Sequence, residues 1–404
     1  MVPGEEERYP ARPVLTALHE GTHQSSESAA RLAAPAQTIR IPVSGRKKKI
    51  LLFAKPAIGD ILLATPLMRS IRQAEPDAVI DLMCYPGQDA ILEGNQDIDN
   101  IVIVERRPGF WHLLRMLKRL WRKYDIAITN GADDRVHLYL FFFGRQRVSV
   151  TFGDRDAWKR WITFASVVED DQHALLRNNQ LGNLLGYKSL YKLTLPVPAH
   201  RRPDSLLPQL IACARSYVVI HPEARLPYKR WTTVGWRAVM WYLSAAGLQV
   251  YLTGGGDLEE NEYHQELLQD APPAASSVSG KLSFGETSEL IASSCLYIGI
   301  DTVNSHIAAA HGVPTIALFG PEKPARWGPW PANHESDAQP WCNEGSQKTG
   351  NVLIIQGSSK CETCRQGACF RRRNRGTDCP LMTGITVEQV QDGIRSMLPT
   401  DLKP

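Results

Sequence analysis

Short apolar runs alternate with amphipathic stretches over most of the chain that follows residue 48. Four of these runs have the length and composition of buried strands: Ile50–Ala54, Val79–Met83, Ile101–Val104 and Asp125–Thr129. A helix is predicted from the turn after the first run to Ile71, and the apolar spacing of Phe110–Lys123 is helical. Strands that alternate with helices in this way predict a parallel sheet covered on both faces.

A second alternating series begins after a proline-rich segment. It contains strand candidates at Tyr217–Ile220, Gln249–Thr253, Leu296–Ile300 and Thr315–Leu318, and helix candidates at Val234–Ala246, Leu258–Gln269 and Asn304–His311. Two such series predict an α/β protein with two doubly wound, Rossmann-like domains that face a cleft. Open α/β sheets bind ligands outside the carboxyl ends of their strands, so functional residues are expected where strands end.

The length and composition suggest where the domains begin and end. A chain of 404 residues is longer than one hydrophobic core usually serves. Residues 1–48, rich in Pro, Ala, Ser, Glu and Arg, are expected to form a flexible tail. The first domain is expected over 49–195, a linker over 196–216, the second domain over 217–385, and a C-terminal helix and tail over 386–404.

The composition also excludes several classes of protein. No apolar run approaches the length of a bilayer crossing; the strongest, Leu138–Phe143, predicts a short buried strand. The N-terminus lacks the apolar core of a secretory signal, so a cytoplasmic location is expected, with peripheral contact at the inner face of the inner membrane as an option. The net charge of +4 suits an anionic substrate or a membrane surface, whereas nucleic-acid binding needs a denser basic face.

A carboxylate follows the first strand directly. Gly59 permits a tight turn there, and Asp60 then lies at the mouth of the predicted sheet. In that position Asp60 could take a proton from a substrate hydroxyl. The alternative is that Asp60 caps the next helix. If Thr65 and Pro66 begin that helix instead, Asp60 is left in a loop and the chemical interpretation gains weight.

Two loops of the second domain suit a phosphate ligand. Arg225, Lys229 and Arg230 follow the strand that ends at Ile220, and clustered cations form strong charge-assisted hydrogen bonds with a diphosphate. The alternative is a solvated basic loop. The run Gly254-Gly255-Gly256 opens a helix after a strand and brings backbone N–H groups close to a phosphate or ribose, or is a plain turn.

The sharpest motif follows Leu296–Ile300. That strand delivers Asp301 and Thr302 to a helix N-terminus, where exposed N–H groups and the helix dipole favour an anion. Ser305 and His306 fall in the first turn of this helix. Thr302 and Ser305 offer hydroxyl donors, and Asp301 could order the loop or hold a ribose. His306, taken by itself, is more often structural than a ligand.

Together these stretches resemble glycosyltransferase family 9, the lipopolysaccharide heptosyltransferases, over residues 49–398. The family pattern matches here as Gly59-Asp60, Lys229-Arg230-Trp231, Asp301-Thr302 with His306, and Phe319-Gly320-Pro321. The linker and the tryptophan-rich end of the last motif look most similar to the heptosyltransferase III branch. Four motifs in the family's order form a specific signal.

The resemblance implies a GT-B fold and an inverting transfer without a metal cofactor. An anionic, lipid-linked glycan would bind to the first domain and an ADP-activated heptose to the second. By this similarity Asp60 is the general base and Lys229 balances the diphosphate. Asp301, Thr302 and His306 would line the nucleotide site, with Leu282 against the adenine. The remaining candidates for donor binding are Arg225, Gly254, Gly255 and Ser305.

The chain also departs from the family. Many relatives carry Gly-Pro or Ala-Pro after the Asp-Thr/Ser pair, where this chain has Val303 and Asn304. Three interpretations therefore stay open. The chain is a heptosyltransferase acting on lipopolysaccharide core, a GT-B transferase that glycosylates a protein, or a nucleotide-binding relative without activity.

Two further features lie outside these motifs. Cys361, Cys364, Cys369 and Cys379 form a cluster that predicts either a structural Zn or Fe site or free thiols, because cytosolic cysteines rarely form disulfides. Phe110–Lys123 carries an apolar stripe at Phe110, Leu113, Leu114, Leu117, Leu120 and Trp121 among basic residues. This helix either packs its stripe on the first sheet or also contacts anionic lipid through Arg115, Lys118 and Arg122.

Overall fold

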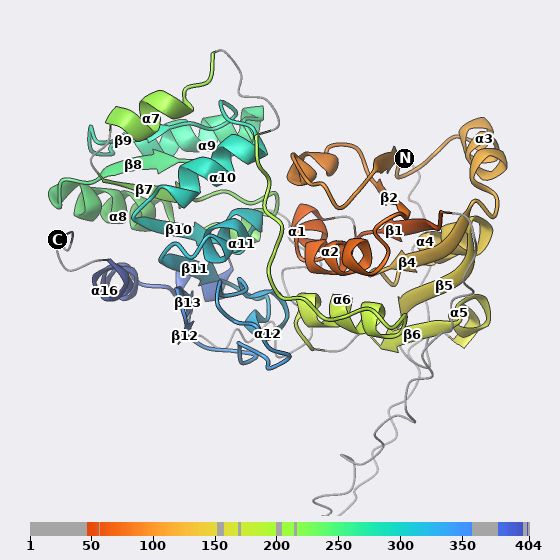
Figure 1. Ribbon diagram of the computed structural model, residues 1–404. Coiled ribbons are helices and arrows are strands. Elements are labelled where there is room, and N and C mark those ends of the chain that lie inside the picture. The colour runs from red at the N-terminus through yellow and green to blue at the C-terminus, as the bar shows by residue number, and fades with distance from the viewer. Residues whose placement is uncertain are drawn as a thin grey trace, which may run out of the picture. The chain divides into compact units, whose positions relative to one another are not determined.

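The computed structural model describes residues 47–55, 57–151, 157–168, 171–198, 204–213, 216–357, 379–398 and 402 (Figure 1). Within these ranges the chain forms two α/β lobes, each built on one sheet. The expected tail at 1–48 lies almost wholly outside the described residues.

The first lobe contains a six-stranded sheet in which all strands run parallel, in the order β3-β2-β1-β4-β5-β6. Its strands are β1 (Lys49–Phe53), β2 (Val79–Cys84), β3 (Asn100–Ile103), β4 (Tyr124–Thr129), β5 (Gly144–Thr151) and β6 (Ala165–Val168). The strand β1 lies in the middle of the sheet and is almost completely buried, which explains its continuous run of apolar residues.

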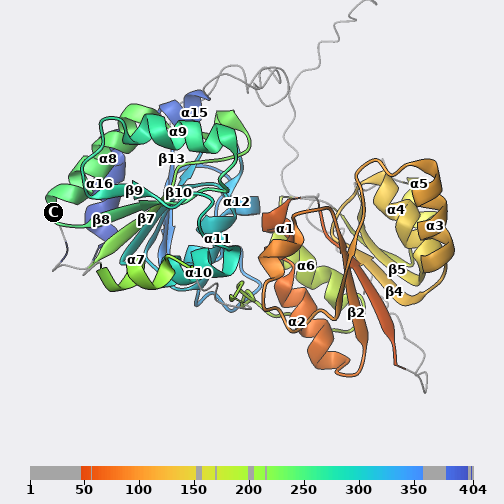
Figure 2. The same cartoon turned by 90° about the horizontal axis from the view of Figure 1, so that it is seen from above.

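Helices cover both faces of this sheet (Figure 2). One face carries α1 (Ile58–Leu62), α2 (Thr65–Ala74) and α6 (Ala174–Asn183). The opposite face carries α3 (Phe110–Leu120), α4 (Asp134–Phe143) and α5 (Ala157–Ile162). A short 3-10 helix, η1 (Asp89–Leu92), follows β2.

The second lobe repeats this plan with one extra antiparallel strand, in the order β12-β13-β11-β10-β7-β8-β9. Its strands are β7 (Tyr217–His221), β8 (Gln249–Leu252), β9 (Ala275–Ser277), β10 (Leu296–Ile300), β11 (Thr315–Phe319), β12 (Gln347–Thr349) and β13 (Val352–Gln356). In both sheets the winding direction reverses beside the first strand, between β1 and β4 and between β7 and β10. Ligands of doubly wound folds bind at such reversals.

The helices of the second lobe also form two layers (Figure 2). One layer contains α8 (Thr233–Ala245), α9 (Leu258–Leu268) and α16 (Val387–Met397), and the other contains α7 (Leu207–Cys213), α10 (Phe284–Ala292) and α11 (Val303–Ala310). Shorter helices are η3 (Pro227–Lys229), α12 (Pro324–Trp327) and α15 (Pro380–Thr383). The helix α16 packs against α8, β11 and β13, so residues 387–397 are part of the second core.

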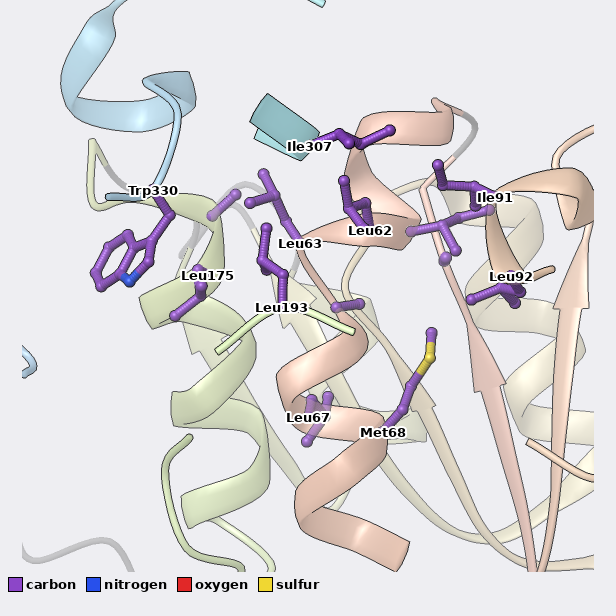
Figure 3. Close-up of a cluster of buried hydrophobic side chains, with 14 of the residues drawn as sticks. Leu62, Leu63, Leu67, Met68, Ile91, Leu92, Leu175, Leu193, Ile307 and Trp330 are labelled. Atoms are coloured by element: carbon purple, nitrogen blue, oxygen red, sulfur yellow. The ribbon is translucent and has the colours of Figure 1, made fainter. Parts of the chain in front are cut away.

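Apolar side chains from the two lobes meet in one buried cluster (Figure 3). Leu62 and Leu63, at the end of α1, lie beside Ile307 of α11, and Trp330 lies next to Leu175 of α6. All five side chains are at most 2% exposed. The facing surfaces of the lobes are therefore joined by apolar packing around the place where the loops after β1, β7 and β10 meet.

The doubly wound α/β fold was predicted correctly, and most elements lie within a few residues of their predicted positions. The prediction for Leu138–Phe143 was wrong, because these residues belong to helix α4 rather than to a strand. Asp133 caps this helix by accepting hydrogen bonds from the amides of Arg135 and Val136. The predicted linker also contains a helix, α7.

The expectation that α3 buries its whole apolar stripe was only partly right. Leu120 is buried, and Leu113 and Leu117 pack partly against the core between the sheet and α4. Phe110, Leu114 and Trp121 are instead exposed. None of the helices in the described ranges combines the length and the apolar composition that a bilayer crossing requires.

Candidate functional site

The first lobe contributes a carboxylate from α1, the short helix that follows β1. Asp60 lies in α1, and its backbone amide donates to the carbonyl of Ala57. The helix α1 has no side-chain cap, and α2 begins at Thr65, whose hydroxyl donates to the carbonyl of Leu62. Asp60 is thus not a helix cap. Thr65 and Pro66 do begin a helix, α2, but Asp60 lies in the separate short helix α1 and not in a loop.

The second lobe contributes an ion pair from two neighbouring strands. Lys229 ends η3, the turn that follows β7, and Asp301 follows β10 directly. Their Nζ and Oδ2 atoms lie 2.7 Å apart. The strands β7 and β10 are hydrogen-bonded neighbours, which is why residues 72 positions apart in the sequence meet here.

A cavity of about 290 Å³ brings these groups together. It is lined by Ala57, Gly59, Asp60 and Leu63 of the first lobe and by Lys229, Asp301, Thr302, Val303, His306, Glu322 and Trp327 of the second. The lining combines a carboxylate, a paired ammonium group and a helix N-terminus. It is the arrangement that a phosphate-bearing ligand and a nearby proton transfer require.

The environment of Asp60 raises the pKa of its carboxyl group. Burial is the main cause, and it is opposed by the positive charges of Lys55, Arg177 and other nearby cations. A carboxylate with a raised pKa accepts a proton more readily near neutral pH, as a general base must. Asp60 lines the cavity, where a substrate hydroxyl could reach its carboxylate.

Lys55 is the cation whose charge acts most strongly on Asp60. Burial, together with the Arg177 guanidinium, lowers the pKa of Lys55 to about 7. Its Nζ lies 5.6 Å from the ring centroid of Trp327, a cavity residue of the second lobe. Its backbone amide donates to the Asn130 side chain at 2.8 Å, which fixes the loop after β1 to the loop after β4.

Lys229 remains charged in this site. Burial disfavours the ammonium charge, but Asp301 and Glu322 outweigh that effect and hold the pKa of Lys229 above its ordinary value. One of its three N–H donors is taken by Asp301. An ammonium group with two further donors that faces a cavity suits a diphosphate.

His306 presents a neutral imidazole to the cavity. Burial lowers its pKa to about 4, against the opposing effect of Asp301. Within the described ranges its Nδ1 atom is buried without a hydrogen-bond partner. A buried nitrogen of this kind is costly unless a ligand or water satisfies it, so the observation favours a ligand at this point of the cavity.

The structure does not bring every predicted site residue into this cavity. Ser305 is fully buried, and its hydroxyl donates to the carbonyl of Ile300 at 2.7 Å. Arg225 is exposed on its loop, and Leu282 is half-buried against the shared apolar cluster. None of the three is among the residues that line the cavity.

The glycine run after β8 has a packing explanation. A Cβ atom at Gly254 would lie 2.7 Å from the Ser279 Oγ atom, and one at Gly256 would lie 2.4 Å from the Gly280 Cα atom. Gly255 lies beside the carboxylate of Glu260. This turn is therefore pressed against the loop that follows β9, and neither Gly254 nor Gly255 lines the cavity.

Glu322 and Trp327 line the cavity but were not singled out from the sequence. Neither was Lys55, whose charge acts on Asp60. Glu322 directly follows the Phe319-Gly320-Pro321 motif, and Trp327 lies in the tryptophan-rich end of the same stretch. That adjacency was the signal available for both residues. Lys55 had no such signal, because a lysine after a strand is common on protein surfaces.

The predicted metal cluster lies mostly outside the described residues, since Cys361, Cys364 and Cys369 all do. Cys379 is buried in the core of the second lobe. In the part of the chain that the structure covers, no group of His, Cys, Asp and Glu has the arrangement of a metal site.

The sequence is similar to known proteins of one enzyme family. A family model described as glycosyltransferase family 9 (heptosyltransferase) matches residues 113–349. Lipopolysaccharide heptosyltransferase 3 of Escherichia coli is 31% identical over 291 residues, covering 68% of this chain and 84% of that protein. The same enzyme from Escherichia coli strain K12 is 29% identical and covers 68% of this chain and 83% of its own length.

Solved structures show the same architecture. The ADP-heptose lipopolysaccharide heptosyltransferase II of E. coli aligns with a TM-score of 0.63 at 18% identity, covering 86% of this chain and 98% of that one. A glycosyl transferase of family 9 from Veillonella parvula also gives a TM-score of 0.63 at 18% identity, with coverages of 87% and 97%. The fold is the GT-B type.

Proposed function

Because the chain belongs to glycosyltransferase family 9, we propose that it moves a heptose from an ADP-activated donor to a lipopolysaccharide core acceptor. The observation that carries this proposal is the single cavity in which Asp60 of one lobe faces the Lys229–Asp301 pair of the other. Its relatives of known name include lipopolysaccharide heptosyltransferases 3, 1 and 2.

In the proposed reaction Asp60 is the general base. Its carboxylate takes the proton of the acceptor hydroxyl as the hydroxyl oxygen attacks the anomeric carbon of the donor. The new C–O bond forms on the face opposite the diphosphate, the bond to the diphosphate oxygen breaks, and ADP leaves with that electron pair. The configuration at the anomeric carbon is inverted, and Asp60 returns the proton to solvent.

The second lobe is proposed to hold the donor. Lys229 would interact with the diphosphate, whose negative charge increases as the bond to the sugar breaks. Asp301 holds the ammonium group of Lys229 in place at 2.7 Å. Thr302 and the N-terminus of α11 would donate hydrogen bonds to the diphosphate. The Nδ1 atom of His306, which has no partner among the described residues, would form a hydrogen bond with the ADP-heptose. In this scheme a lysine supplies the charge that a metal ion supplies in other transferases.

The acceptor also has a consequence for where the enzyme works. Lipopolysaccharide core is built on a lipid, so we propose that the protein contacts a membrane surface peripherally during transfer. The basic character of α3 and its surroundings supports this contact.

One experiment tests the proposed function. Purified protein is incubated with ADP-, GDP- or UDP-activated heptose or hexose, with and without delipidated core oligosaccharide, and nucleotide release is followed together with the mass of the oligosaccharide. We expect ADP release that depends on the acceptor, with a mass gain of one heptose. Release from another nucleotide, or transfer to a protein in place of the oligosaccharide, would contradict the proposal.

A further inference from the structure

A second cavity lies on the first lobe, between helix α3 and the edge strand β3. Its volume is about 370 Å³, larger than that of the candidate active site, and none of the residues lining the two cavities is shared. The lining consists of Ile101, Val102 and Ile103 of β3 and of His112, Arg115, Met116, Arg119, Leu120 and Lys123 in and just after α3. The groove has an apolar floor and a basic rim.

The helix beside this groove exposes large apolar side chains. Phe110 and Trp111, at its N-terminus, are 70% and 73% exposed, and their rings contact each other edge to face with centroids 5.3 Å apart. Leu114 and Trp121 are also exposed. Clustered exposed aromatic side chains on a folded protein mark an interaction surface. Ile101 and Ile103, which line the groove, are exposed as well.

The charge of this surface has one sign. Residues 106–123 contain seven Arg and Lys residues and no Asp or Glu. Arg115, Lys118 and Arg119 are exposed, and in the described part of the chain none of them forms an ion pair. Their charges therefore face solvent and are available to a negatively charged partner.

The combination of residues selects the partner. Tryptophan and phenylalanine with arginine and lysine beside them suit the boundary between lipid head groups and acyl chains. A second copy of this chain would bring the exposed positive charges of Arg115, Lys118 and Arg119 in both copies close together, which costs free energy. A purely electrostatic partner would leave the exposed aromatic residues in water.

We propose that α3 and the groove beside it bind the surface of an anionic phospholipid bilayer. Phe110 and Trp111 enter the head-group layer, Arg115, Lys118 and Arg119 contact lipid phosphates, and one phospholipid occupies the groove with its phosphate at the basic rim. The biological role of this surface rests on the proposed function, because the surface would bring the enzyme to a lipid-linked acceptor. Binding itself does not require transfer.

The test is co-sedimentation of the full-length protein with vesicles of phosphatidylcholine alone or mixed with phosphatidylglycerol, at low and high salt. Three variants are compared with the wild type. Phe110→Ser/Trp111→Ser removes the aromatic pair, Arg115→Glu/Lys118→Glu/Arg119→Glu reverses the charge, and Val234→Ser/Leu258→Ser removes exposed apolar side chains from the second lobe as a matched control. All these side chains are exposed, and thermal unfolding confirms that each variant is folded.

We expect the wild type and the control to bind the mixed vesicles equally and the neutral vesicles weakly. The charge reversal should weaken binding about a hundredfold at low salt. Each basic residue near the membrane surface contributes about 1 kcal/mol to binding, and this variant lacks three of them. The aromatic variant should lose the part of the binding that survives high salt. Equal binding by all four proteins, or no binding by the wild type, would overturn the proposal.

Two further readouts separate the alternatives. Sedimentation velocity without lipid shows whether the aromatic variant changes the oligomeric state, in which case the surface joins copies of this chain and the proposal is wrong. Transfer to delipidated core oligosaccharide should be the same in all variants. If that transfer is absent from the wild type, the proposed function fails while the result on lipid binding stands by itself.

Discussion

At the scale of single residues, the candidate site depends on side chains whose surroundings change their chemistry. Asp60 and His306 line the same cavity, yet burial raises the pKa of the carboxyl group and lowers that of the imidazole. Both shifts favour the neutral forms. Asn304, one of the residues at which the chain departs from its family, is buried and its amide contacts His221 Nδ1 at 3.0 Å. That departure ties α11 to β7.

Asp60→Asn is expected to lower kcat by about a hundredfold or more, the usual effect of a lost general base. The amide has the shape of the carboxylate but cannot take the proton. Binding of ADP-heptose, measured by calorimetry, should stay within a few-fold of the wild type. Asp77→Asn makes the same chemical change at an exposed site and should leave kcat unaltered. A kcat for Asp60→Asn close to that of the wild type would remove Asp60 from the mechanism.

Lys229→Ala is expected to weaken donor binding and to slow transfer, each by about tenfold or more, because a buried diphosphate loses its balancing charge. The affinity for ADP-heptose and single-turnover rates measure the two effects separately. Lys348→Ala, an exposed lysine of the same lobe, is the control. In the metal-free scheme EDTA leaves the rate unchanged, and a strict requirement for Mg²⁺ would argue against the role given to Lys229.

At the scale of elements, loops that follow neighbouring strands are fitted closely together. The turn after β8 and the loop after β9 meet at Gly256 and Gly280, and both glycines have positive φ angles, +85° and +68°. Neither residue tolerates a side chain, because the backbone of the other occupies the space. The glycine run, taken by itself, suggested a phosphate loop. In the structure, glycine is required there because the two loops pack too closely for a side chain.

Gly256→Ala and Gly247→Ala are expected to separate backbone strain from close contact. Both glycines have positive φ, but a Cβ atom at Gly247 meets nothing within 4 Å, whereas one at Gly256 would lie 2.4 Å from the Gly280 Cα atom. Gly247→Ala should lower the free energy of unfolding by about 1–2 kcal/mol. Gly256→Ala should cost about 1–3 kcal/mol more, from overpacking. Chemical denaturation measures both, and equal losses would contradict the contact.

At the scale of the whole molecule, the two lobes are joined by buried polar contacts as well as by the apolar cluster. His173, at the start of α6, donates from Nε2 to the carbonyl of Gly328 at 2.8 Å and accepts at Nδ1 from the amide of Leu175. These two bonds require the neutral imidazole, and burial lowers its pKa to about 3. A second contact between the lobes joins α10 to the end of η1, where the amide of Gly285 donates to the carboxylate of Glu93.

The free energy of unfolding is expected to fall as the pH drops below about 6.5, the ordinary pKa of histidine. Burial lowers the pKa to about 3 for His173 and to about 4 for His221, His264 and His306. Below pH 6.5 these histidines bind more protons in the unfolded chain than in the folded one, so their contribution to stability is complete above pH 6.5 and is lost toward pH 4. Burial also raises the pKa of Asp60 and raises that of Glu223 to about 7. These two carboxyl groups oppose the trend, but four histidines outweigh them.

Urea denaturation at pH 7.5 and pH 5 measures this loss. His173→Gln retains a hydrogen-bond donor without the titrating ring and should reduce the difference between the two pH values. His112→Gln, at an exposed histidine, should leave the difference unaltered. A protein that is equally stable at both pH values would show that these histidines are not held neutral.

The sequence by itself determined the order of strands and helices, the doubly wound fold of each lobe and the four motifs of the family. Those features follow from local periodicity and from residues that are neighbours along the chain. It did not determine that Leu138–Phe143 is helical, because a short apolar run fits a buried helix as well as a strand. In the structure this run belongs to α4, whose N-terminus is capped by Asp133. For the site, the sequence supplied Asp60, Lys229, Asp301, Thr302 and His306.

Only the tertiary structure decided which candidates share a cavity. Ser305 lies one residue from His306, but a helix turns by about 100° per residue, so its hydroxyl points to the strand and not to the cavity. Glu322 and Trp327 enter the site because β11 lies beside β10, a pairing between distant segments. Burial, which shifts the pKa values of Lys55 and Asp60, likewise arises from chain segments far apart in the sequence.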